Sequence, residues 1–125
     1  MNDLLEYSQR VRDILSDPKV WTTGCLFRTP EGRPIRNDVL SEWEPAQVPD
    51  DCLMCLNGAK IKALNHPGWT RDLFQQHTVA FCIANNLEND ANSPVRFNDA
   101  ISTTHGRLLD ALDRTVELVR GNLPG

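Results

Sequence analysis

The sequence has no long run of apolar residues. Its longest run, Val79 to Ala84, spans about two helical turns, whereas a membrane-spanning helix needs about 20 apolar residues. The first residues carry charges at Asp3, Glu6 and Arg10, where a secretory signal would have an apolar core. We therefore expect a cytoplasmic protein that makes no membrane contact.

Positive charge is also in short supply. The chain has 13 Lys and Arg against 17 Asp and Glu, which gives a net charge of -4. Binding along a phosphate backbone needs clustered positive charge, so this balance disfavours nucleic acid as a partner. The local group Arg28, Arg33 and Arg36 is interrupted by Glu31 and Asp38, and we interpret it as a solvated loop.

The four cysteines follow no complete metal or disulfide pattern. Their number in a chain without a signal segment indicates reduced thiols. Cys52 and Cys55 form half of a zinc-ligand pattern, and a redox dithiol there is opposed by the neighbouring Asp50 and Asp51. We expect no metal and no cofactor, and we expect both thiols to pack as small apolar groups in a helix. Four further side chains could in principle complete a zinc site with this pair, but their spacing matches no zinc-ligand pattern: Cys25, His66, His77 and Cys82.

What is present is the composition of an ordinary globular domain. The 125 residues are 40% hydrophobic and 24% charged. Apolar periodicity and caps predict four helices, at about 3–16, 52–64, 71–87 and 105–120. Thr70 and Thr104 are the predicted caps of the last two. Residues 21–35, with the turn Thr29-Pro30-Glu31-Gly32, predict a small β-hairpin.

The predicted helix at 52–64 is mostly apolar, so we expect it at the buried centre, covered by the other three. Gly58 and Ala59 in its middle lower helix propensity, and we expect close packing against another element to be the reason. Val95 to Phe97 is expected to be extended, and its pairing with the hairpin would make a three-stranded sheet. The prediction is one α+β domain over residues 1–125, mainly helical, with 121–125 as a frayed tail.

Three short motifs follow one another along the chain: Trp21-Thr22-Thr23-Gly24, then Cys55-Leu56-Asn57-Gly58-Ala59, then Phe97-Asn98-Asp99-Ala100 with Thr104-His105 behind it. In this order they resemble a family of small actinobacterial and actinobacteriophage proteins known as a domain of unknown function. That family's pattern reads W-T-x-G, C-x-x-G-A and W-N-D-A-x-x-x-T-H, with Phe97 here in place of the last Trp. The resemblance implies no activity, substrate or cofactor. It implies a bacterial or phage setting.

Cys55 is the candidate nucleophile of an enzymatic interpretation. His77 or His105 would be its base and Asn98 or Asp99 the orienting group, because these residue types suit acyl-transfer chemistry. A cysteine inside an apolar helix is more often inert, so we favour a protein that is not an enzyme. The alternative function is a small enzyme or ligand-binding domain with a pocket near Cys55, Asn98 and Asp99. Asn98 and Asp99 can equally satisfy backbone donors in their own turn.

The three tryptophans, Trp21, Trp43 and Trp69, lie at predicted element boundaries. There an aromatic ring either anchors a loop or forms an exposed contact surface. Trp43, between Glu42 and Glu44, is the best contact candidate, followed by Trp21. The main hypothesis is a non-enzymatic protein-interaction module, phage-encoded and acting on a bacterial host component. A self-associating structural module, which would form a homo-oligomer, is a third possibility.

Overall fold

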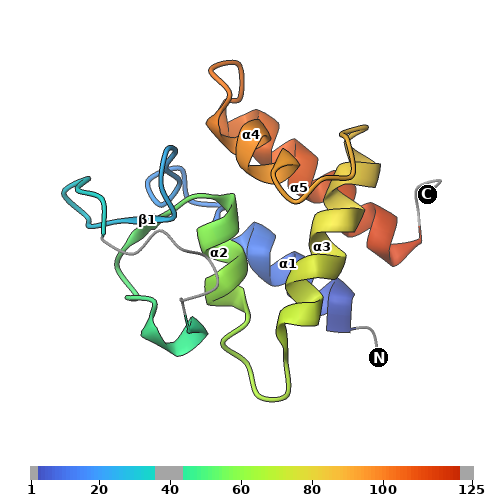
Figure 1. Cartoon of the computed structure of the whole chain (residues 1–125), viewed down its shortest axis with the longest axis horizontal. Coiled ribbons are helices and arrows are strands. Elements are labelled where there is room, and N and C mark those ends of the chain that lie inside the picture. The colour runs from blue at the N-terminus through green and yellow to red at the C-terminus, as the bar shows by residue number, and fades with distance from the viewer. Residues whose placement is uncertain (1–2, 36–43, 122–125) are drawn as a thin grey trace.

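The structure is a computed structural model that describes residues 3–35 and 44–121. In this part of the chain five α-helices accompany a two-stranded antiparallel sheet (Figure 1). The mainly helical α+β prediction is confirmed, with one helix more than the four predicted. None of the described helices is long and apolar enough to cross a membrane. The elements are α1 (Asp3–Ile14), β1 (Phe27–Arg28), the short 3-10 helix η2 (Pro45–Gln47), β2 (Leu53–Met54), α2 (Leu56–Ala63), α3 (Arg71–Ala84), α4 (Ser93–Asp99) and α5 (His105–Arg120).

The core forms around α2, in which every residue but Lys62 is buried. A helix that is buried nearly all round has to be enclosed by other elements on most sides. α1 packs against α2 and α3, and α4 packs at the N-terminal end of α2 (Figure 1). The predicted buried central helix is therefore confirmed. α5, however, packs mainly on α1 and α3.

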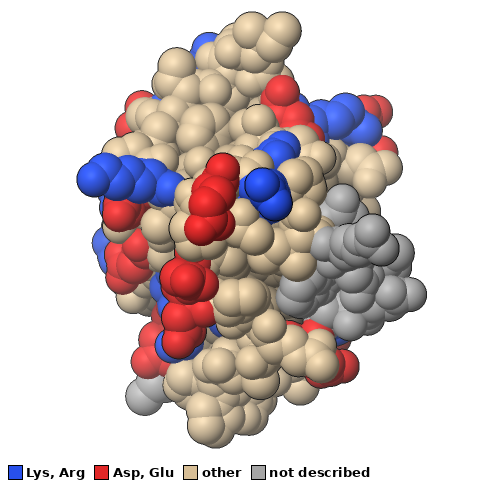
Figure 2. All heavy atoms as spheres, turned by 90° about the vertical axis from the view of Figure 1, so that its left-hand side faces the viewer, with Lys and Arg blue, Asp and Glu red and all other residues tan. Residues whose placement is uncertain are grey.

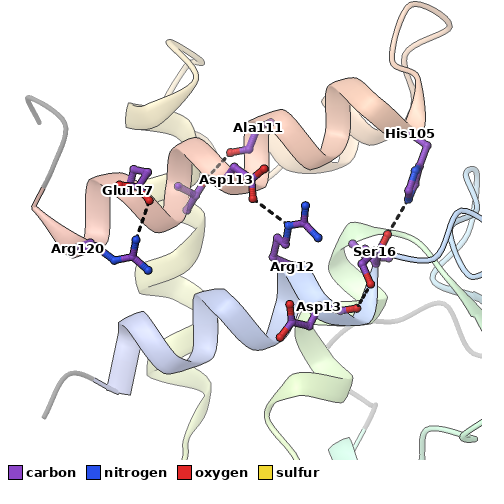
Figure 3. A network of polar contacts seen from close by, with 10 residues as sticks. Arg12, Asp13, Ser16, His105, Ala111, Asp113, Glu117 and Arg120 are labelled. Atoms are coloured by element: carbon purple, nitrogen blue, oxygen red, sulfur yellow. Dashed lines mark hydrogen bonds and ion pairs between the residues drawn. The ribbon is translucent and has the colours of Figure 1, made fainter.

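Polar contacts join α1 to α5 along their shared edge (Figure 3). The guanidinium Nε of Arg12 lies 2.9 Å from Oδ1 of Asp113, a pair exposed enough to contribute little stability. At the other end His105 Nε2 lies 2.7 Å from the carbonyl oxygen of Leu15. His105 is thus tied to the end of α1, and its ring also lies 6.0 Å from that of Trp21, measured between centroids.

The predicted hairpin would pair β1 with the residues that follow the turn, up to Ile35, but the main strand partner of β1 is a different segment. The turn does form, with the N–H of Ile35 donating to the carbonyl oxygen of Phe27 at 3.0 Å. Pairing on that side is an isolated bridge between Arg28 and Pro34, since proline has no N–H for a ladder. Instead β1 pairs with β2, placing Phe27 opposite Met54 and Arg28 opposite Leu53.

Two predictions about secondary structure are wrong: the residue at which α2 begins, and the extended conformation of residues 95–97. α2 begins at Leu56, not at Cys52, and its cap is Cys55, whose Sγ accepts from the N–H of Gly58 at 3.4 Å. Neither Asp50 nor Asp51 is that cap. The segment Val95 to Phe97 is part of α4, and Pro94 stands in its first turn, where a missing N–H costs nothing. The predicted third strand therefore does not exist.

Gly58 lies where the backbone of the segment before β1 touches α2. A Cβ at this position would clash with the carbonyl oxygen of Leu26 and lie 3.1 Å from a ring carbon of Phe27. The expected close packing at this glycine is confirmed, and a side chain there would push α2 away from the loop.

We expect Gly58→Ala to lower the free energy of unfolding by about 1–3 kcal/mol, the usual cost of overpacking. Gly106→Ala is the matched control, because a Cβ there has its nearest neighbour at 3.9 Å. That change should leave stability unchanged or raise it by up to about 1 kcal/mol, since alanine favours helix. Urea denaturation measures both, and equal effects would contradict the assigned contact.

Candidate functional site

Asn98, near the end of α4, uses its whole carboxamide to join three segments. It is 1% exposed. Its Oδ1 accepts from the indole N–H of Trp21 at 2.7 Å and from the N–H of Leu56 at 3.0 Å. Its Nδ2 donates to the carbonyl oxygen of Thr22 at 3.2 Å and to Oδ1 of Asp99 at 2.9 Å. With all four hydrogen-bonding positions engaged, Asn98 is a structural tie.

Asp99 continues this tie to the loop after α1. Its Oδ1 also accepts from the N–H of Gly24 at 3.0 Å. Gly24 has a φ of 84°, a conformation that glycine adopts without strain. The three motifs of the sequence thus meet at one corner of the fold, where α4 lies beside the N-terminal end of α2 (Figure 1).

A pocket of about 330 Å³ opens at this corner, and we call it the corner pocket. It brings together Cys55, Asn98 and Asp99, which the sequence analysis grouped as candidates. Cys25 and Asn57 also line it, although the sequence does not mark either as a candidate for this pocket. The full lining is Gly24, Cys25, Leu26, Cys55, Asn57, Ala91, Asn92, Val95, Asn98 and Asp99.

Asn57 is the unusual side chain of this wall. It is 6% exposed, and its Oδ1 is buried without a hydrogen-bond partner in the part of the chain that the structure describes. An unsatisfied buried carbonyl costs about 1–3 kcal/mol. The signal in the sequence was an asparagine in the first turn of an otherwise apolar segment, where a polar side chain needs an explanation.

Cys55 is held as a neutral thiol. Burial raises its pKa to about 11, and the nearby charge of Asp99 acts in the same direction. The thiolate, which is the nucleophilic form, is therefore scarce at neutral pH. The candidate bases lie elsewhere: His105 contacts Leu15, and His77 packs against Tyr7, with ring centroids 5.8 Å apart. Neither histidine lines the corner pocket.

The other predicted site residues have structural contacts or fall outside the description. Cys52 donates its S–H to the carbonyl oxygen of Pro49 at 3.2 Å. No disulfide joins the four cysteines, all of which are described, and within residues 3–35 and 44–121 no cluster of three or more His, Cys, Asp or Glu could hold a metal ion. Trp21 is half-buried with its N–H on Asn98, so it anchors a loop. Trp43 lies outside the described residues.

A second hollow, of about 540 Å³, lies between α1 and the loop that joins α2 to α3. Trp69 is its aromatic wall, with the ring of His66 stacked on it at 4.1 Å and the guanidinium of Arg10 at 6.0 Å. This hollow is open, and acidic and basic side chains line it together. None of the described side chains along it is a buried polar group without a partner, so it is the weaker candidate.

Figure 2 shows the face of the molecule that bears β1. Basic and acidic side chains interleave on this face, and no broad region of one sign is visible. A surface that binds a phosphate backbone would show clustered Lys and Arg. This face offers no such cluster.

The fold and the corner pocket define a small, mainly helical α+β protein with a pocket whose lining includes Asn57, a carboxamide side chain left without a partner for its Oδ1 among the described residues. The chain belongs to the family of unknown function DUF6197, whose model matches residues 2–118. No curated protein matches the chain, and no solved structure does. The family description assigns no activity, so function has to be argued from the pocket itself.

Proposed function

We propose that this protein is a non-enzymatic domain that binds a small molecule in the corner pocket. The observation that carries the proposal is Asn57, a residue of the pocket lining whose buried Oδ1 has no partner within the described residues. The volume of about 330 Å³ falls within the range of ligand sites, about 300–1,000 Å³. A bound molecule would supply the missing hydrogen bond.

The composition of the wall supports binding over turnover. Leu26, Ala91 and Val95 give it an apolar side, while Asn57 and Asp99 give it a few polar groups, the mixture typical of ligand pockets. The pKa of the Cys55 thiol is too high for a nucleophile at neutral pH, and no histidine lines the pocket to serve as base. Recognition without chemistry is therefore the best-supported function.

A fragment screen followed by backbone amide NMR tests this proposal. We expect bound fragments to shift the amide signals of Cys25, Asn57 and Asp99 together. Ala91→Trp should abolish these shifts, because it places an indole at the wall of the pocket from an exposed position. Ala100→Trp is the matched control: it is also exposed beside α4 but lies outside the lining, so binding should persist. Binding that survives Ala91→Trp would refute the assignment.

A protein partner is a second proposal, favoured by a separate observation. Ile101, on the turn between α4 and α5, is fully exposed, and an isoleucine in that position is available for contact. We also propose, from the sequence, that the protein has an actinobacterial or phage origin, that its partner is a host component and that it is located in the cytoplasm. A screen in which no fragment reaches the corner pocket would shift the weight to this second function.

A further inference from the structure

The free hydrogen-bonding capacity of the corner pocket is mostly acceptor capacity. Oδ1 of Asn57 is buried without a donor among the described residues. Asp99 uses Oδ1 for the N–H of Gly24 and for Asn98, while its Oδ2 has no partner within the part of the chain described. Two side chains therefore present oxygen atoms that a ligand could satisfy.

The donors at this corner are already engaged inside the protein. The N–H of Leu56, at the start of α2, donates to Asn98, and the N–H of Gly58 donates to the sulfur of Cys55. The N–H of Gly24 is taken by Asp99. The first turn of α2 thus lacks the free N–H groups with which a helix start binds an anion. Two side-chain donors remain in the lining, the Nδ2 atoms of Asn57 and Asn92, for which no described residue is a partner.

The charges around the corner pocket favour the same kind of ligand as its free acceptor atoms do. Asp99 is the one charged side chain of the lining. Arg28 lies nearby, but its guanidinium donates to Thr22, Thr23 and Gly32, and it does not line the pocket. Arg96 on α4 is directed to Asp90, 3.8 Å away, and to Ser93. Hydrogen bonds to neutral oxygens do not cancel the charge of Arg28, but Asp99 is the charge that a ligand in the pocket would contact, and it favours a positive group there.

We infer that the ligand carries a cationic nitrogen head group with several N–H donors, such as a primary ammonium or a guanidinium, on a short apolar body. This inference rests on the proposed function. The head group would donate to the carboxylate of Asp99 and to Oδ1 of Asn57, and a bond to an ionised acceptor is the stronger kind. The apolar body would lie against Leu26, Ala91 and Val95.

Three probes that share a short alkyl chain and differ in the charge of the head group test the inference: n-butylammonium, butyramide and butyrate, each titrated into the labelled full chain at fixed pH and salt. The amide of Gly24 reports directly on Asp99, to which it donates. We expect n-butylammonium to bind tightest and butyrate weakest. Asp99→Asn keeps an oxygen for Gly24 and for Asn98 but removes the charge. It should weaken n-butylammonium binding about tenfold while leaving butyramide unchanged.

Asp110→Asn is the control, because this carboxylate lies outside the corner pocket and its loss should leave all three affinities unchanged. Equal or tighter binding of butyramide or butyrate at the same amides would overturn the cationic inference and leave the proposed function standing. If none of the three probes shifts these amides while other fragments do, the cationic inference is again refuted and the proposed function still stands. If no fragment of any class binds there, both fall.

Discussion

Replacing Asn98 with alanine is expected to lower the free energy of unfolding by about 2–5 kcal/mol. The change removes the acceptor of the Trp21 indole N–H and of the Leu56 N–H, and each buried donor left unpaired costs about 1–3 kcal/mol. It also frees the carbonyl oxygen of Thr22. Urea denaturation followed by tryptophan fluorescence measures this loss, and Trp21 should become more exposed in the folded variant.

Two further variants distinguish the loss of the Asn98 hydrogen bonds from the general effect of shortening an asparagine side chain. Asn98→Asp keeps one acceptor oxygen but turns a second oxygen toward the carbonyl of Thr22 and the carboxylate of Asp99, so it should also destabilise. Asn92→Ala is the matched control at the other end of α4, where the asparagine is exposed and makes no side-chain cap bond. It should change stability by less than about 0.5 kcal/mol. If Asn98→Ala costs no more than Asn92→Ala, Asn98 is not a structural tie.

The second large effect concerns Lys60, a lysine fully buried in α2. Its Nζ lies 2.6 Å from the hydroxyl oxygen of Thr78 and 4.0 Å from the centroid of the Phe74 ring. Thr78 donates its own proton to the carbonyl oxygen of Phe74 at 3.1 Å, so it is free to accept from Lys60. No carboxylate among the described residues pairs with this amine. Burial lowers the pKa of Lys60 from 10.5 to about 7.

A lowered pKa in the folded state makes stability depend on pH with a definite sign. Between about pH 7 and 10.5 the unfolded chain holds a proton on Lys60 that the folded chain does not. Unfolding then takes up a proton, so stability rises with pH by about 1.4 kcal/mol per unit. Burial also lowers the pKa of His77, which removes further stability in acid. Burial raises the pKa of Cys55 and of Tyr7, so Cys55 offsets this rise above about pH 9 and Tyr7 reverses it above about pH 10.

We therefore expect Lys60→Met to raise the free energy of unfolding at pH 7 by about 1–4 kcal/mol, since an apolar side chain of similar length replaces a group that burial penalises. Its stability should also rise less between pH 7 and 9 than that of the parent chain. Lys62→Met is the control: Lys62 is half-buried on the same helix and pairs with Asp50 at 3.3 Å, and this variant should keep the parent's slope. A destabilised Lys60→Met with the slope intact would show that the ammonium is well accommodated.

The elements that the sequence predicts well are those with local signals. Thr104 and Gly121 bound α5 as predicted, because a cap and a left-handed glycine act within one turn. Thr70 likewise begins α3. The start of α2 and the nature of 93–99 depend instead on a thiol cap and on packing between distant segments, which local propensity does not show.

At the candidate site, too, the sequence predicts some features and not others. Cys55, Asn98 and Asp99 were grouped from residue type and motif, and the structure places all three at one pocket. Their roles could not be predicted, because the full hydrogen bonding of Asn98 depends on Trp21 and Leu56, which are far from it in sequence. The orphaned carbonyl of Asn57 can be recognised only once its neighbours are known.

The central claim is that the corner pocket is a ligand site. Crystals of the full chain soaked with a mixture of small amines and neutral fragments test it most directly. The account predicts difference density in the corner pocket, with a nitrogen within hydrogen-bond distance of Asn57 or Asp99. A corner pocket that stays empty while fragments occupy the hollow beside Trp69 would contradict it.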